Sequence, residues 1–142
     1  MSGSYSGRVR LFVELRAHLR CEYCRRPQPI TGVTFHIEHV TPRAQGGRTR
    51  LDNLALACPN CNYRKADQRQ AEDPKTGRPV MLYNPRRNRW AAHFRWSRNR
   101  LMLQGRTAKG RATIKALGLN QSDHQAFRRL WKERFRDLFP FD

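Results

Sequence analysis

Two pairs of cysteines constrain this chain more than any other feature of its sequence. Cys21 and Cys24 form one CxxC pair, Cys58 and Cys61 form the second, and 33 residues separate the pairs. Paired CxxC motifs are typical of a structural metal site, while two disulfides or a redox-active CxxC are the alternatives. A redox CxxC usually accompanies a βαβ pattern, which this sequence lacks. We therefore predict a structural zinc ion bound by the four thiolates.

The beginning of the sequence and its hydropathy indicate in which cellular compartment the protein is expected. The segment MSGSYSGRVR lacks the apolar stretch of a secretory signal, and no run of about 18 apolar residues could span a bilayer. We therefore expect a cytoplasmic protein whose cysteines stay reduced, which favours metal binding over disulfides. The chain has 142 residues, of which 38% are hydrophobic, so its core is thin. Zinc binding, worth about 10–16 kcal/mol in zinc-finger peptides, would add directly to its folding free energy.

The charge of the chain predicts the chemistry of its partner. Lys and Arg number 29 against 11 Asp and Glu, which gives a formal net charge of +18. A compact chain with this much positive charge favours a polyanion such as DNA. No acidic residue occurs between Pro74 and Ser122, so that stretch is expected to form a surface that follows phosphates. The residues predicted to contact nucleic acid are Arg43, Arg48, Lys65, Arg86, Arg87, Arg89 and Arg95. A solvated surface charge is the alternative for the first three.

Local patterns predict an α+β chain in two parts. Residues 1–70 are expected to form a core stapled by zinc, and residues 71–142 a basic extension that packs on the core and contacts nucleic acid. In the first part, apolar spacing and alternation predict a helix at 8–20, strands at 33–40 and 54–57, and a helix from Pro59. In the second part, they predict a turn-rich connection at 71–80, strands at 81–84 and 92–103, and helices at 107–118 and 121–138.

Aromatic residues in the second part allow two interpretations. Trp90, Phe94 and Trp96 lie among arginines, so they either stack on exposed bases or belong to the core. In the last predicted helix, apolar residues recur every three or four positions and predict a stripe that faces the core. The members of that stripe are Phe127, Leu130, Trp131, Phe135 and Leu138.

Residues between and beside the CxxC pairs have the types needed for hydrolytic chemistry. Glu38 and His39 end a predicted strand just before a turn, which can bring both side chains into one cleft, and Asn62 directly follows the second CxxC pair. A carboxylate and an amide oxygen are hard ligands that suit Mg²⁺ or Mn²⁺. A histidine with a pKa near 6.5 can accept a proton from water at neutral pH. His36, two residues before Glu38, is either a further metal ligand or a packed strand histidine.

Three segments follow one another in a characteristic order: CEYC at 21–24, HIEHVTPRAQGG at 36–47 and LDNLALACPNCNYRKAD at 51–67. Together they resemble the HNH nucleases, a family with the ββα-metal fold. The resemblance covers about residues 18–68, and the later stretch is similar to the tail of small stand-alone bacterial or phage-type members.

The resemblance implies a role for four residues. His39 corresponds to the general base, and Glu38 takes the position of a metal-binding carboxylate. Asn53 corresponds to the residue that holds the loop and orients the histidine. Asn62 stands where the family often has His, so the chain is an HNN variant in which Asn62 can bind the metal through its carbonyl oxygen.

The resemblance also implies an activity. We expect a metal-dependent endonuclease that hydrolyses DNA phosphodiester bonds with Mg²⁺ or Mn²⁺ and leaves 5′-phosphate and 3′-hydroxyl ends. Double-stranded DNA is the expected partner, and one active centre per chain favours nicking. The alternatives are a non-catalytic zinc-stabilised nucleic-acid-binding module and a structure-specific or RNA-directed nuclease. The sequence does not distinguish a monomer from a homodimer.

Overall fold

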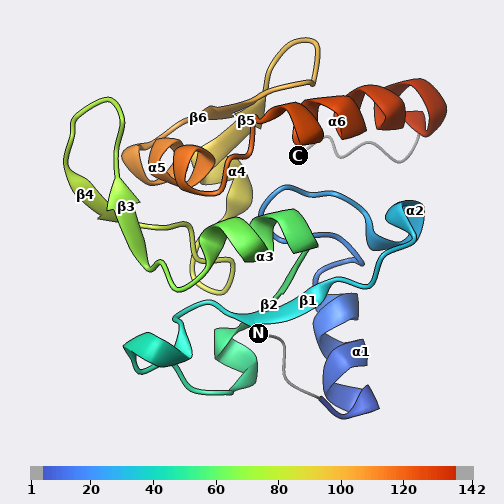
Figure 1. Cartoon of the computed structure of the whole chain (residues 1–142), viewed down its shortest axis with the longest axis vertical. Coiled ribbons are helices and arrows are strands. Elements are labelled where there is room, and N and C mark those ends of the chain that lie inside the picture. The colour runs from blue at the N-terminus through green and yellow to red at the C-terminus, as the bar shows by residue number, and fades with distance from the viewer. Residues whose placement is uncertain (1–4, 137–142) are drawn as a thin grey trace. The chain divides into compact units, whose positions relative to one another are not determined.

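The computed structural model of the chain describes residues 5–136 (Figure 1). The chain divides into two compact units. The first, called the finger unit below, comprises Met1–Arg69 and Asn84–Arg87, and the second, the C-terminal unit, comprises Gln70–Tyr83 and Asn88–Asp142. Across the part of the chain that the structure describes, no helix combines the length and the hydrophobicity needed to cross a membrane. The mixture of short helices and short antiparallel sheets confirms the predicted α+β class.

The finger unit begins with α1 (Gly7–Arg16), which is shorter than the helix predicted at 8–20. Its N-terminus is capped by Ser6, whose hydroxyl accepts a hydrogen bond from the backbone N–H of Val9 at 3.2 Å. The helix ends early because His18 and Leu19 both adopt positive φ angles, of 55° and 59°. This backbone turns the chain out of the helix and into the first CxxC pair.

A hairpin and a helix form the centre of the finger unit. The strands β1 (His36–His39) and β2 (Leu54–Ala57) pair antiparallel, with His36 opposite Ala57 and His39 opposite Leu54. Helix α3 (Pro59–Lys65) follows β2 directly and packs against both strands (Figure 1). Proline at the first helical position fits there because it has no N–H to leave unpaired. The short elements that complete the unit are α2 (Gln28–Thr31), η1 (Arg43–Gln45) and η2 (Leu51–Asn53).

As far as residue 136, the C-terminal unit contains two hairpins and three helices. Its strands are β3 (Gln70–Glu72) paired with β4 (Pro79–Met81), and β5 (Phe94–Trp96) paired with β6 (Leu103–Gly105). Its helices are α4 (Trp90–His93), α5 (Ala108–Ala116) and α6 (Ser122–Arg134). The structure corrects two predictions, since 71–80 contains a hairpin instead of a plain connection and 92–103 is divided among α4, β5, a turn and the first residue of β6. The strand predicted at 81–84 is also wrong, because only Met81 belongs to β4.

The core of the C-terminal unit is aromatic. The rings of Trp90 and Phe94 lie 5.1 Å apart between centroids, and both side chains are buried, so the core interpretation holds for them. Trp131 on α6 is buried as well, whereas Leu130 is 51% exposed and Phe135 is 40% exposed, so the predicted stripe is wrong at these two positions. Leu138 and the end of the helix predicted at 121–138 lie outside the described residues.

One buried ion pair links the β3–β4 hairpin to α5. The fully buried carboxylate of Asp73 accepts two hydrogen bonds from the guanidinium of Arg111, at 2.9 and 3.0 Å. This bidentate contact holds the pKa of Asp73 well below its usual range. Nearby, α5 approaches the end of α4 so closely that a Cβ atom on Gly110 would lie 2.0 Å from the carbonyl oxygen of His93. Only glycine fits at this contact.

Candidate functional site

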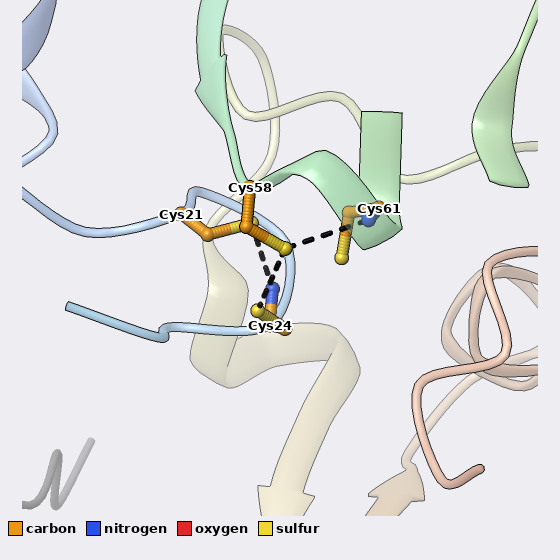
Figure 2. Close-up of side chains that lie close together, drawn as sticks. All are labelled: Cys21, Cys24, Cys58 and Cys61. Atoms are coloured by element: carbon orange, nitrogen blue, oxygen red, sulfur yellow. Dashed lines mark hydrogen bonds between the residues drawn. The ribbon is translucent and has the colours of Figure 1, made fainter. Parts of the chain in front are cut away.

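The four cysteines converge in the finger unit, as Figure 2 shows. All are buried and free of disulfides, and their sulfur atoms lie within 4.8 Å of one another. The sulfurs of Cys24 and Cys58 are 3.7 Å apart. Four sulfurs placed tetrahedrally about 2.3 Å from a zinc ion would be separated by about 3.8 Å, so the cluster fits zinc.

The protonation of the cluster depends on whether a cation is bound. Burial raises the pKa of Cys21 well above its usual value, and hydrogen bonds among the cysteines do the same for Cys61. A zinc ion reverses this effect because a coordinated thiol is deprotonated. Two backbone N–H groups point at sulfurs, from Cys24 to Cys21 at 3.5 Å and from Cys61 to Cys58 at 3.4 Å. They stabilise the negative charge that the thiolates of a zinc site carry.

The two residues between the first pair of cysteines connect the cysteine cluster to the rest of the unit. The carboxylate of Glu22 accepts a hydrogen bond from the backbone N–H of Leu56 at 2.9 Å and forms an ion pair with Arg86. The Arg86 side chain is therefore only 10% exposed and is paired with Glu22, and the prediction that it contacts nucleic acid is corrected. Sequence reasoning missed Glu22 and Tyr23. The only available signal was the presence of a carboxylate and a phenol inside a metal-binding turn.

Glu38 lies inside the finger unit and has partners on two sides. The hydroxyl of Tyr23 donates to its Oε1, and the ammonium group of Lys65 lies 3.0 Å from its Oε2. Glu38 is only 7% exposed. Burial raises the pKa of the Glu38 carboxyl above its usual value, while the charge of Lys65 and the hydrogen bond from Tyr23 oppose this rise. The same burial raises the pKa of Tyr23.

Lys65 is enclosed by hydrogen-bond acceptors. Besides Glu38, its Nζ donates to the backbone carbonyls of His39 at 3.2 Å and Val40 at 2.9 Å. The side chain is 2% exposed. The prediction that Lys65 contacts phosphate is therefore corrected, because all three donors of the ammonium group are used within the unit.

Removing this ammonium group should destabilise the finger unit strongly. We expect Lys65→Met to cost about 3–5 kcal/mol of unfolding free energy, because it leaves the Glu38 carboxylate buried without its ion-pair partner. Urea unfolding followed by far-ultraviolet circular dichroism would measure the loss. The double variant Glu38→Gln/Lys65→Met is the control, and it should recover most of the stability. A single variant as stable as the parent chain would contradict the structural role given to the pair.

His39 is the last residue of β1, and its side chain has different surroundings from that of Glu38. Its Nε2 lies 2.8 Å from the hydroxyl oxygen of Thr49. Burial lowers the pKa of His39 below its usual value of about 6.5, and the positive charges of Arg43 and Lys65 lower it further. The structure therefore gives Glu38 and His39 different partners, as expected for adjacent strand residues. Thr49 had no distinguishing sequence signal.

Asn53 fixes the loop that carries Thr49. Its Oδ1 accepts a hydrogen bond from the backbone N–H of Thr41 at 2.8 Å. Its Nδ2 donates to the carbonyls of Thr41 at 3.1 Å and Arg48 at 2.9 Å. The loop also packs tightly, since a Cβ atom on Gly47 would lie 1.8 Å from the carbonyl oxygen of Thr41. These contacts hold Thr49 beside His39.

The remaining predicted residues differ in accessibility. Asn62 is half-buried and lies three residues before Lys65, so both occupy the face of α3 that meets β1. Within residues 5–136, the structure gives no hydrogen bond to the side-chain amide of Asn62. His36 is half-buried at the start of β1 and does have a partner. The exposed arginines of the predicted set are Arg43, Arg48 and Arg87 in the finger unit and Arg89 and Arg95 in the C-terminal unit.

Comparison with known proteins agrees with this arrangement. Residues 21–68 match the model of the HNH endonuclease family. The search of curated proteins and the search of solved structures returned no significant match. The matched segment contains all four cysteines, the β1–β2 hairpin with His39, and α3 with Asn62. In its residues 21–68, the chain is therefore similar to the HNH endonuclease family.

Proposed function

We propose that this protein is a metal-dependent endonuclease that hydrolyses phosphodiester bonds in DNA, with His39 as the general base. The observation that carries the proposal is the state of the His39 imidazole. It is half-exposed at the end of β1, its pKa is lowered, and Thr49 orients one of its two ring nitrogens. At neutral pH such a ring is unprotonated and has a fixed direction, as a general base requires.

The contact with Thr49 supports different roles for the two ring nitrogens of His39. A histidine that acts as a base must have a free lone pair, so the proposal assigns the proton to Nε2, which would then donate to the Thr49 hydroxyl oxygen 2.8 Å away. Nδ1 then takes a proton from the attacking water. The water oxygen forms a bond to phosphorus, the bond from phosphorus to the 3′ oxygen breaks, and the leaving oxygen is protonated from solvent. The products carry 5′-phosphate and 3′-hydroxyl ends.

The residues present fit a catalytic divalent ion by their chemistry. Within residues 5–136, the structure gives no hydrogen bond to the amide oxygen of Asn62, and each carboxylate oxygen of Glu38 accepts one contact there and so keeps a lone pair. Glu38 and Asn62 would therefore hold Mg²⁺ or Mn²⁺, with His36 as a further candidate ligand. When bound, the ion supplies positive charge to the scissile phosphate and its leaving oxygen. Lys65 holds Glu38 in place on the face of α3 that also carries Asn62.

Exposed arginines support DNA as the substrate. Arg43 and Arg48 lie in the segment between β1 and β2 that also carries Thr49, and both are exposed. Arg43 is close enough to affect the pKa of His39. A phosphate held by such side chains would lie near the proposed base. Contacts of this kind position a backbone without reading its sequence.

The chemistry of the cleaved ends tests the proposed reaction. We expect the purified zinc-loaded protein to cut an end-labelled DNA duplex in Mg²⁺ or Mn²⁺. The new 3′ ends should be extended directly by a polymerase, and the 5′ ends should be ligated without a kinase. Ends that require phosphatase treatment before extension would show that a different bond breaks. A matched single-stranded DNA and a matched RNA duplex would establish the substrate class in the same experiment.

The lowered pKa of His39 predicts how the activity depends on pH. The base works only when neutral, so kcat/KM should rise with pH through the pKa of His39 and level off, with a midpoint below 6.5. Arg43→Gln removes a positive charge that lowers this pKa, so it should move the midpoint to higher pH. Arg48→Gln is the control, because Arg48 is exposed in the same loop and is not a source of the shift. An unchanged midpoint in Arg43→Gln would exclude His39 as the group that titrates.

A further inference from the structure

The β5–β6 ribbon of the C-terminal unit presents one polar face and buries the other. Its register places Arg95 opposite Gln104 and Trp96 opposite Leu103. Phe94 and Leu103 are buried, whereas Arg95 and Gln104 are exposed. Two hydrogen bonds extend the pairing past the strand ends, at 2.8 Å each, from Ser97 N to Met102 O and from Arg106 N to His93 O. The outer face therefore displays an Arg–Gln pair, and Arg106 follows Gln104 by two residues on that face.

The back of the ribbon is held by side chains from the following segment. The amide of Asn120 accepts from the backbone N–H of Leu103 at 2.7 Å and donates to its carbonyl at 2.8 Å. Arg128 on α6 donates to the carbonyl of Leu101 at 2.9 Å, and its guanidinium lies 5.2 Å from the ring centre of Trp96. These contacts fix the ribbon before any partner binds. A preorganised element loses little entropy on binding.

The Arg–Gln pair on the outer face has a specific geometry. The Nε of Arg95 donates to the Oε1 of Gln104 at 2.8 Å. This bond holds the guanidinium across the ribbon, and within residues 5–136 the structure gives no hydrogen bond to its two terminal nitrogens. Neighbouring Arg98 and Arg106 are exposed, and no acidic residue occurs between Pro74 and Ser122 to neutralise them. The outer face of the ribbon therefore presents the guanidinium N–H donors of Arg95 in a fixed orientation, with further positively charged side chains nearby.

We propose that this ribbon enters the major groove of duplex DNA and that Arg95 reads a guanine. The inference rests on the proposed function for its choice of DNA. A two-stranded ribbon fits the major groove of B-form DNA, and an arginine fork donates to the O6 and N7 atoms of guanine. Gln104 acts as a positioning residue for Arg95, while Arg98 and Arg106 contact phosphates. The deep, narrow major groove of A-form RNA excludes such a ribbon.

Selection from a random duplex library tests this proposal. All chains carry His39→Ala, so that bound DNA is not cut, and are otherwise full length and zinc-loaded. We expect the parent to enrich sites with a fixed guanine, and Arg95→Ala to lose the preference at that position alone. Replacing that guanine should weaken binding of the parent by about 5- to 150-fold and leave Arg95→Ala almost unaffected. A duplex RNA of the same sequence should bind far more weakly.

Two further variants separate base reading from charge. Arg95→Lys keeps the charge but loses the bond to Gln104, so it should bind DNA with a similar salt dependence and a weaker guanine preference. Lys115→Ala removes an exposed charge on α5, away from the ribbon, and should leave the selected sequence unchanged. Thermal melting confirms that each variant is folded.

The outcomes separate this proposal from the proposed function. Enrichment of the same site by Arg95→Ala, or no base preference in the parent, would overturn the guanine-reading role even if the wild-type chain cleaves DNA. Loss of the preference in Arg95→Ala would support the role even if the wild-type chain fails to cleave.

Discussion

His39→Ala is expected to lower the rate of DNA cleavage by about 10²- to 10⁴-fold, the usual contribution of a general base. The substitution removes the imidazole whose Nε2 contacts Thr49 and whose pKa the finger unit keeps low. Because the side chain is half-exposed and is not part of the core, the fold and the zinc content should be unchanged. Single-turnover cleavage of a labelled duplex, with enzyme in excess, measures the chemical step without product release.

A second histidine variant serves as the matched control for this prediction. His18 is exposed after α1 and adopts a positive φ angle of 55°, which asparagine also tolerates. His18→Asn should therefore cleave at the wild-type rate. If His39→Ala also cleaved at that rate, a group other than His39 would be the base.

Loss of the zinc site should have the largest effect on stability. The four cysteines join the segment after α1 to the start of α3, and structural zinc contributes about 10–16 kcal/mol in zinc-finger peptides. A whole domain is stable by only about 5–15 kcal/mol, so Cys58→Ser is expected to unfold the finger unit. Elemental analysis should give a single zinc ion in the wild-type chain. Amide hydrogen exchange should show loss of protection in β1, β2 and α3 of the variant.

Chelation provides an independent version of this experiment. Removing zinc from the wild-type chain under reducing conditions should expose the β1–β2 hairpin, and adding zinc back should restore its protection. An apo chain that kept full protection in these strands would show that the cysteines pack as an ordinary core and do not depend on a metal.

The elements nearest the cysteines were predicted well because local chemistry determines them. The apolar run LALA becomes β2 with the predicted bounds, and Pro59 begins α3 as expected for proline in the first turn. The β3–β4 hairpin was missed because its strands are short and mostly exposed, so they show no apolar alternation. The sequence does not show directly how long a strand is or how much of it is buried. These two properties explain why β2 was predicted and the β3–β4 hairpin was not.

The side-chain partners in the site were harder to predict than its backbone. The strand predicted from the alternation included Glu38, but the sequence did not show that Tyr23 and Lys65 would surround its carboxylate. These partners come from 15 residues earlier and from the next helix, so their proximity depends on tertiary packing. For the same reason, Arg86 was assigned to nucleic acid although it pairs with Glu22, 64 residues away in sequence. In a chain with so many arginines, the sequence does not show which of them pairs with a particular carboxylate.

Relaxation of supercoiled plasmid DNA tests the central claim most directly. The zinc-loaded wild-type chain should convert supercoiled plasmid to nicked circles when Mg²⁺ or Mn²⁺ is added, and should stop when that ion is withdrawn while its zinc content stays constant. His39→Ala, assayed in parallel, should leave the plasmid supercoiled. Nicking that persists in His39→Ala, or a wild-type chain that binds the plasmid but leaves it intact with every divalent ion, would contradict the account.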